Sequence, residues 1–445
     1  MSLEREFNNY YFIIRGKVYN TAANYKRVLQ YDPLLKGAIR KNLLTERIDI
    51  VKPLGWYRDS PTLTDVDVKY LLLYFEENYG LTVEKKIIDA VAVIANENRY
   101  HPVCDFLNAL QWDGTERIRF CLHRFLGSDT DDYTYEALKL FLLGAISRAF
   151  KPGCKFEVML CLVGGQGAGK SSFFRLLAVN DDWFSDDLKK LDDENVYRKM
   201  QGHWIIEMSE MIATANAKSI EEIKSFLSRQ KETYKIPYET HPADRKRQCV
   251  FGGSSNTLDF LPLDRTGNRR FVPVMVYPER AEVHILADEQ ASREYINQMW
   301  AEAMEIYRSG NFRLRFSPAM NDYLKAHQKD FMPEDTKAGQ ILDYLERYSG
   351  SIVCSKQLYK EALGHDYDEP KQWELREIND IMNNAVTGWM AFSNPRYFPE
   401  PYRRQKGWER IRNDNEPDNS MDGFQEIPTE EMEQLGLPEE WLKQK

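Results

Sequence analysis

Long apolar runs are absent from this sequence: no stretch of its 445 residues approaches the roughly 20 apolar residues that span a bilayer. The first residues, MSLEREFNNYYF, lack the basic and apolar regions of a secretory signal peptide. The six cysteines form no C-x-x-C pair and no cluster with histidine, which argues against a zinc site and against a disulfide framework. We therefore expect an intracellular, cytoplasmic protein with no membrane partner.

The chain has little net charge outside its C-terminal end. The whole chain carries −9, and residues 413–445 hold ten acidic and two basic side chains, so the other 412 residues carry only −1. An acidic segment of this kind is usually solvated, and we expect residues 413–445 to form a disordered tail. The acidic net charge therefore does not exclude a nucleic-acid partner for the rest of the chain.

A glycine-rich stretch dominates the middle of the chain. The apolar run from Phe156 ends in GGQGAGKS, which matches G-x-x-x-x-G-K-[ST], and a helical pattern follows. Glycines let backbone N–H groups approach phosphates, Lys170 can reach the β- and γ-phosphates, and Ser171 can bind Mg²⁺. A chance glycine-rich turn is the alternative. We predict a site for ATP and Mg²⁺ formed by consecutive residues of this stretch: Gly164, Gly165, Gln166, Gly167, Ala168, Gly169, Lys170, Ser171 and Ser172.

Strand and helix patterns alternate around this loop. Apolar runs predict strands over 156–163, 202–208, 248–255 and 270–276, and helical spacing predicts helices over 170–177 and 219–229. This alternation favours an α/β fold whose mainly parallel sheet is covered on both faces. Near the C-terminus, three short helical patterns and a strand–turn–strand pattern predict a winged helix-turn-helix. We divide the chain into five parts: a small α/β segment (1–63), a helical domain (64–150), a nucleotide-binding core (151–330), a winged-helix-like domain expected to bind DNA (331–412) and the acidic tail (413–445).

Two acidic residues and one amide follow the predicted strands. Glu207 ends the apolar run WIIE, where a buried carboxylate needs a partner that Mg²⁺ would provide, and Glu210 is placed to orient the attacking water. Asn256 follows the next strand and can contact the γ-phosphate or hold that water. Two surface acids and an ordinary turn asparagine are the alternatives.

Arginines cluster before the last predicted strand, in DRTGNRRF. Such residues can stabilise charge on the γ-phosphate as an arginine finger, which ring-forming enzymes insert into the site of the neighbouring subunit. Arg269 and Arg270 are the preferred candidates, with Arg265 as the alternate. A solvated basic turn is the alternative reading.

Two further segments combine basic and aromatic residues. Residues 231–247 hold five Lys or Arg against three acids and can form a hairpin that tracks a single DNA strand, with Lys231, Lys235 and His241 as contacts. A surface hairpin of mixed charge fits the same pattern. Residues 393–412 hold six Lys or Arg against two Glu and could grip duplex DNA as a wing, or form a protein contact.

Several of these stretches, in this order, resemble the virulence-associated protein E family of phages and pathogenicity islands. The matching stretches are HPVCDFLNALQWDGTERI, LVGGQGAGKSSFFRLLA, GHWIIEMSEM, the expected helix that holds Lys224 to Gln230, IPYETHPADRKRQCVFGGSSN and LDRTGNRRFVPV. The family is similar to superfamily-3 helicases, AAA+-like P-loop NTPases that form hexameric rings around DNA. The resemblance implies Walker B roles for Glu207 and Glu210, a sensor role for Asn256 and a channel hairpin over residues 231–247. The acid pair departs from the usual pattern, because its members stand three residues apart.

The resemblance and the motifs together predict an ATP-dependent DNA helicase. We expect a replication initiator of a phage or mobile element that works as a homo-hexamer in the cytoplasm of a bacterial host. No primase segment is visible, so priming would need a separate primase. The alternative is an ATP-dependent DNA-binding or assembly switch that does not unwind DNA.

Overall fold

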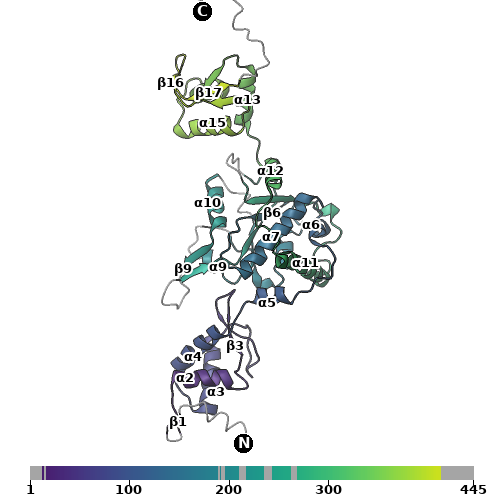
Figure 1. Cartoon of the computed structure of the whole chain (residues 1–445), viewed down its shortest axis with the longest axis vertical. Helices are drawn as coiled ribbons and strands as arrows, with labels where there is room; N and C mark the ends of the chain where they lie inside the picture. The colour runs from purple at the N-terminus through teal and green to yellow at the C-terminus, as the bar shows by residue number, and fades with distance from the viewer. Residues whose placement is uncertain are drawn as a thin grey trace, which may run out of the picture. The chain divides into compact units, whose positions relative to one another are not determined.

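The computed structural model describes residues 13–14, 17–188, 191, 196–209, 217–234, 243–261 and 268–411. The chain divides into two compact units, Met1–Glu334 and Asp335–Lys445 (Figure 1). Within the described ranges, no helix has the length and apolar character needed to cross a membrane. Four predicted site residues lie outside these ranges, as does the acidic tail: Glu210, Lys235, His241 and Arg265.

The first unit begins with a small α/β region. Its elements are β1 (Ile13–Ile14), β2 (Lys17–Val18), α2 (Ala22–Tyr31), β3 (Ile39–Asn42), β4 (Ile48–Ile50), α3 (Asp65–Tyr79), α4 (Glu84–Glu97) and β5 (Arg99–Tyr100). Buried side chains from Tyr25 to Ala95 form one hydrophobic cluster. The predicted division at residue 63/64 cuts through this cluster, because α3 and α4 bury their apolar faces against α2 and β3 and not against the helices that follow.

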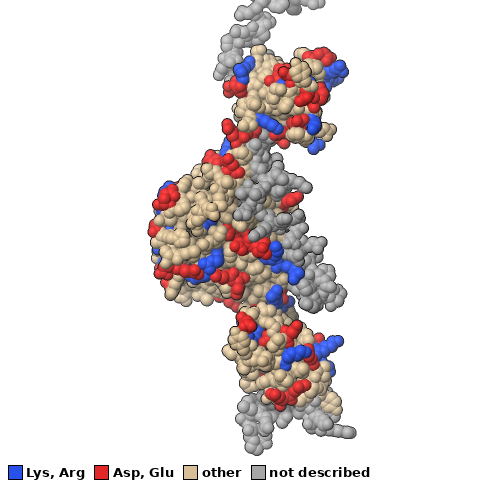
Figure 2. All heavy atoms as spheres, turned by 180° about the vertical axis from the view of Figure 1, so that it is seen from behind, with Lys and Arg blue, Asp and Glu red and all other residues tan. Residues whose placement is uncertain are grey.

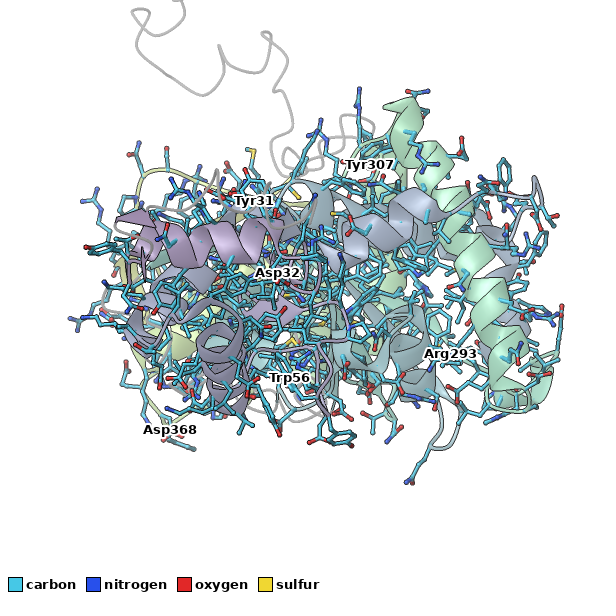
Figure 3. The ribbon with its side chains drawn as sticks, turned by 90° about the horizontal axis from the view of Figure 1, so that it is seen from below. Tyr31, Asp32, Trp56, Arg293, Tyr307 and Asp368 are labelled. Carbon is cyan, nitrogen blue, oxygen red and sulfur yellow. The ribbon has the colours of Figure 1, made fainter. Side chains whose placement is uncertain are left out.

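A buried carboxylate holds this region together. Asp32 lies beside Tyr31 where α2 ends (Figure 3) and is 2 % exposed. Its Oδ2 accepts hydrogen bonds from the hydroxyls of Tyr74, at 2.9 Å, and Tyr79, at 2.5 Å, both on α3. Since a buried carboxylate needs such donors, these bonds fix α3 against the end of α2.

A five-stranded parallel sheet forms the centre of the first unit. Its strands are β6 (Met159–Val163), β7 (Phe184–Ser185), β8 (Ile205–Ser209), β11 (Val250–Ser255) and β12 (Phe271–Met275), in the order β12-β6-β11-β8-β7. Every pairing is parallel. The predicted α/β class is confirmed, and the sheet is consistent with a P-loop NTPase core. The edge strand β7 was not predicted, because two residues give no periodic signal.

Helices cover both faces of this sheet. They are α5 (Pro102–Ala109), α6 (Ile118–Leu126), α7 (Asp132–Phe150), α8 (Lys170–Leu177), α9 (Val196–Met200), α10 (Ala217–Ser228), α11 (Glu289–Ser309) and α12 (Pro318–His327), with 3-10 turns η1 (Asp181–Trp183), η2 (Pro278–Arg280) and η3 (Gln328–Phe331). Alternate residues of β6 divide between the faces: Leu160 and Leu162 join the cluster of α5 to α8 and α11, whereas Met159 and Cys161 join that of α9 and α10. Figure 1 shows α10 to the left of β6 and α6 and α11 to its right.

The second unit is a small mixed fold. Its elements are α13 (Thr336–Arg347), β13 (Ile352–Cys354), α14 (Ser355–Gln357), the π-helical turn η4 (Leu358–Ala362), α15 (Gln372–Asn384), β14 (Trp389–Ala391), β15 (Arg396–Phe398), β16 (Arg403–Gln405) and β17 (Gly407–Arg410). An antiparallel sheet of order β13-β17-β14 packs against the helices, and the β15–β16 hairpin is inserted between β14 and β17.

Candidate nucleotide site

The glycine-rich loop joins the end of β6 to the start of α8. A Cβ atom on Gly164 would lie 2.5 Å from the carbonyl oxygen of Val276, so only glycine fits beside β12 at this position. Gly167 and Gly169 both have φ of +80°, a conformation that other residues rarely adopt, and Gly169 is the N-cap of α8. The loop therefore turns tightly and directs the free N–H groups of the first helical turn outward, which suits it to phosphates.

Glu207 is the buried acid of this site. It lies in the middle of β8 and is 0 % exposed. Its Oε1 accepts hydrogen bonds from Ser171 Oγ at 2.8 Å and from Ser254 Oγ at 2.6 Å, whereas its buried Oε2 has no hydrogen-bond partner among the described residues. Burial raises the pKa of the Glu207 carboxyl, and the two hydroxyls oppose this shift only in part.

Strand β11 brings the amide of Asn256 to the loop lysine. In the register of the sheet, Ser255 is paired with Val163, the last residue of β6, so Asn256 follows at the same edge as the loop. Lys170 Nζ donates to Asn256 Oδ1 at 2.9 Å and to the carbonyl oxygens of Gly164, at 2.6 Å, and Gly165, at 2.8 Å. Burial lowers the pKa of Lys170, and the charge of Glu207 opposes that shift. Three acceptors thus fix the ammonium of Lys170 beside the loop that is predicted to bind phosphates.

These residues surround a cavity of about 590 Å³. Its lining comes from the loop and α8, from the ends of β8 and β11 and from the segment before α11: Gln166, Gly167, Ala168, Gly169, Lys170, Ser171, Ser172, Ser209, Ser254, Ser255, Asn256, Thr257, His284 and Leu286. The structure therefore brings seven of the nine predicted loop residues, 166–172, and Asn256 to one cavity, with Glu207 bonded to Ser171. Gly164 and Gly165 do not line it, and their carbonyl oxygens accept from Lys170. Sequence reasoning did not single out Ser254, although it lies in a stretch that resembles the family. It also missed His284 and Leu286, which belong to no motif.

The site fits Mg²⁺ held together with nucleotide. The described residues contain no group of three His, Cys, Asp or Glu side chains that could hold a metal by itself. Mg²⁺ is usually bound by one or two protein oxygens together with phosphates and water. Oε2 of Glu207, which has no partner among the residues described, and the hydroxyl of Ser171 supply such oxygens, so Glu207 and Ser171 are the residues that would hold the ion.

The predicted finger arginines lie where the parallel strands begin, whereas the glycine-rich loop lies where they end. Arg269 and Arg270 precede Phe271, which is paired with Met159 at the beginning of β6. The glycine-rich loop follows the other end of β6, and the five residues of this strand span about 16 Å. Both contact Glu157 at 3.4 Å, and Arg270 Nε also donates to Ser228 Oγ at 3.0 Å. Neither arginine is therefore placed to reach the cavity of its own chain.

The segment predicted to contact DNA begins as an antiparallel hairpin of β9 (Lys231–Tyr234) and β10 (Ala243–Lys246). Lys231 stands at its base and forms an ion pair with Asp244. A buried ion pair between Glu232 and Arg247 fixes this base to the core, where Arg247 also donates to the carbonyl oxygen of Phe226 at 2.6 Å. The base of the hairpin is thus rigidly anchored.

Comparison with known proteins identifies the family. No curated protein matches the chain. A solved structure described as the A form apo structure of the NrS-1 C-terminal region (305–718) has a TM-score of 0.45 at 14% sequence identity, over 84% of this chain and 96% of that chain. A second structure of that region, with the same coverage, has a TM-score of 0.47 at 14% identity. Residues 107–333, just over half of the chain, match the family model of the virulence-associated protein E-like domain. The predicted resemblance is confirmed, and the chain belongs to the virulence-associated protein E-like domain family.

Proposed function

We propose that this protein is an ATP-dependent DNA helicase that initiates replication of a phage or mobile element in the cytoplasm of a bacterial host. One observation carries the proposal: the lysine and serine of the glycine-rich loop contact an amide and a buried acid from two neighbouring strands. The contacts are Lys170 to Asn256 and Ser171 to Glu207. P-loop enzymes that hydrolyse nucleoside triphosphates need these four functions in one place.

Each residue has a distinct role in this proposal. Lys170 exchanges its bonds to loop carbonyls and to Asn256 for bonds to the β- and γ-phosphates, and Asn256 then contacts the γ-phosphate or the attacking water. Ser171 and Glu207 would hold Mg²⁺, which would neutralise charge on the phosphates of a bound ATP. Glu210 orients the water. Because the loop amides are already fixed, little reorganisation is needed when nucleotide binds.

The arginine finger would act between subunits. Arg269 lies just before β12, at the end of the sheet away from the loop, and its side chain is 70 % exposed. It lines a hollow of about 780 Å³ in which the other charged side chains are Lys155, Arg313, Arg315 and the acid Glu157. Positive charge gathered in a hollow suits an anion such as the phosphate end of a nucleotide bound to the next subunit. Such a head-to-tail contact closes into a ring when the rotation between subunits allows it, and we propose a homo-hexamer.

DNA would contact two parts of the chain. In the first unit, the β9–β10 hairpin would track one strand through Lys231, Lys235 and His241. In the second unit, the order of helices and strands supports a winged helix-turn-helix, in which β15–β16 would be the wing that carries Arg396, Arg403 and Arg404. Figure 2 shows basic and acidic side chains interspersed on the face it displays. Local groups of residues would therefore make the DNA contacts, and a separate primase would supply primers.

ATP hydrolysis and strand separation on a forked DNA substrate test this function. Wild type is compared with Lys170→Ala and with the control Lys85→Ala, which removes an exposed lysine on α4. We expect single-stranded DNA to stimulate hydrolysis, and we expect Lys170→Ala to lose both activities while Lys85→Ala keeps both. Hydrolysis without any response to DNA would contradict the helicase proposal and favour an assembly switch. DNA-stimulated hydrolysis without strand separation would favour a DNA-binding switch.

A further inference from the structure

The segment between β12 and α11 forms one wall of the nucleotide cavity. In the sheet, β6 lies between β11 and β12. The groups proposed to act on the γ-phosphate, Glu207 and Asn256, come from the β11 and β8 side of the glycine-rich loop. The chain that leaves β12 returns to the cavity on the other side of the loop and contributes His284 and Leu286 to the lining.

This segment is held firmly against α6 and the sheet. The backbone N–H of Val276 donates to Val163 O at 2.8 Å, that of Tyr277 to Leu126 O at 2.9 Å and that of Val283 to Arg124 O at 3.1 Å. A Cβ atom on Gly127 would lie 2.0 Å from the carbonyl oxygen of Tyr277, which shows how closely the two backbones approach. A wall fixed in this way is organised before any ligand arrives, which lowers the entropic cost of binding.

His284 and Leu286 stand on either side of a buried anchor. Ile285 is 0 % exposed, and its Cγ2 lies 3.4 Å from the Cβ position of Gly169, so it packs against the loop itself. Leu286, by contrast, is 41 % exposed on the cavity wall although it is apolar. The backbone N–H of Leu286 donates to His284 Nδ1 at 3.2 Å. Because Nδ1 of His284 accepts this bond, Nε2 is the ring nitrogen that can donate.

From this geometry we infer that His284 and Leu286 form the nucleobase subsite. The inference rests on the proposed ATP-binding function. When the loop cradles the phosphates with the γ-phosphate near Asn256 and Glu207, the α-phosphate, ribose and base extend away from those residues. The wall formed by His284 and Leu286 lies on that side. A leucine side chain and an imidazole ring offer an apolar surface and a hydrogen-bond donor, which suit a flat heteroaromatic base.

Binding of ATP compared with binding of inorganic tripolyphosphate tests this subsite. Tripolyphosphate keeps the phosphates but lacks ribose and base. Affinities of both are measured by calorimetry with Mg²⁺ for wild type, His284→Ala, Leu286→Ala and the control Leu73→Ala, which truncates an exposed leucine on α3. Each cavity variant is expected to bind ATP about tenfold more weakly, because it loses contacts with the base, and to bind tripolyphosphate as wild type does. Unchanged tripolyphosphate binding also shows that the variant is folded.

The results of these binding measurements distinguish failure of the nucleobase subsite from failure of the proposed ATP-binding function. If wild type binds ATP but His284→Ala and Leu286→Ala bind it with unchanged affinity, the nucleobase subsite is wrong and the ATP site stands. Equal weakening of ATP and tripolyphosphate would also overturn the subsite, because the two residues would then support the loop and not the base. If wild type binds neither ligand, the ATP-binding function fails and the subsite fails with it.

Discussion

The hydroxyl of Ser171 donates a 2.8 Å hydrogen bond to Oε1 of Glu207, which joins the first turn of α8 to the middle of β8. Ser254 donates a second bond to the same oxygen from β11. Two hydroxyls thus hold one oxygen of a fully buried carboxylate and leave the other without a partner among the residues described. The carboxylate is fixed in position, and its free oxygen is the point at which a cation would be held.

The buried state of Glu207 predicts how stability depends on pH. Burial raises the pKa of Glu207, so the folded state binds its proton more tightly than the unfolded state does. The contribution of Glu207 to the free energy of unfolding is therefore present below its unfolded pKa and is lost as the pH rises through its folded pKa. We expect the Tm of the ligand-free protein to fall less between pH 4.5 and pH 8, roughly the range above the ordinary carboxyl pKa, in Glu207→Gln than in wild type. Calorimetry across this range measures the difference, and parallel pH profiles would contradict the prediction.

Glu207→Gln also affects hydrolysis. Glutamine keeps the shape of the side chain and can still accept from Ser171, but it removes the negative charge that would hold Mg²⁺. We expect hydrolysis to fall by about 100-fold or more. A steady-state ATPase assay measures this effect, with Glu84→Gln on α4 as the control because that acid is far from the loop in sequence and pairs with the exposed Lys69. Activity within about twofold of wild type would refute the role of Glu207.

The contact between Lys170 and Asn256 predicts different effects of two substitutions on ATP binding. In Asn256→Asp a carboxylate would face the ammonium at about the same 2.9 Å and would repel the γ-phosphate, so ATP should bind at least about tenfold more weakly. In Asn256→Ala the lysine is released from this contact, and ATP binding should stay within about threefold while hydrolysis slows by about tenfold or more. Binding and turnover measured separately, with the exposed Asn311→Ala as control, test both. Similar ATP affinity in the two variants would count against this pairing.

The part of the nucleotide site that could be predicted is the part formed by residues close together in the sequence. The glycine-rich loop, β6 and α8 follow from a continuous stretch of sequence in which an apolar run, glycines and a helical pattern succeed one another. Glu207 and Asn256 were candidates because each follows apolar residues of a strand. Their distance from Lys170, however, depends on β11 lying between β6 and β8, and strand order is set by tertiary packing that no local pattern encodes.

Other parts of the structure left no sequence signal. His284 and Leu286 lie in a turn with no motif, and they reach the cavity only because the segment after β12 is bonded to α6. The grouping of α3 and α4 with α2 was missed for a similar reason. Their amphipathic patterns show that each buries one face but not which partner covers it.

A close approach between α8 and β11 predicts a stability effect. A Cβ atom on Gly252 would lie 2.3 Å from Cε1 of Phe174, a buried ring of α8. Gly252→Ala should therefore lower the free energy of unfolding of the first unit by about 1–3 kcal/mol through overpacking. As a control, Gly339→Ala on the exposed side of α13 meets nothing within 4 Å and should raise the stability of the second unit by about 0.5–1 kcal/mol. Urea unfolding tests both, and a neutral Gly252→Ala would show that the ring of Phe174 moves aside.

The hairpin of the second unit predicts a salt-dependent effect on DNA binding. Arg404 and Lys406 are exposed at and next to β16, where a wing would contact phosphates. The full-length double variant Arg404→Ala, Lys406→Ala should bind duplex DNA more weakly and reduce the slope of log K against log salt by about 2, one for each lost phosphate contact. Arg347→Ala, an exposed arginine of α13, serves as control. An unchanged slope would remove the wing from the proposed DNA interface.

The separation of Arg269 from the loop predicts that two inactive variants restore activity when they are mixed. Lys170→Ala removes the loop lysine and Arg269→Ala the finger, so neither forms a complete site alone. If Arg269 acts in the neighbouring subunit, random mixed rings contain intact Lys170 facing intact Arg269 at about a quarter of their interfaces, and ATPase activity should recover to about that fraction. Arg308→Ala, which removes an exposed arginine of α11, should be active by itself.

The same mixing experiment decides between the two candidate arginines. Arg270 is 21 % exposed and is held by Ser228 and Glu157, whereas Arg269 is 70 % exposed with a single ion pair to Glu157. A finger must be free to enter another subunit, so we expect recovery with Arg269→Ala and no recovery with Arg270→Ala, whose loss disturbs its own chain. Recovery with Arg270→Ala alone would reverse this assignment. Absence of recovery with either variant, when both are folded and assembled, would mean that the finger does not act across subunits, because only a site shared by two chains can be completed by mixing.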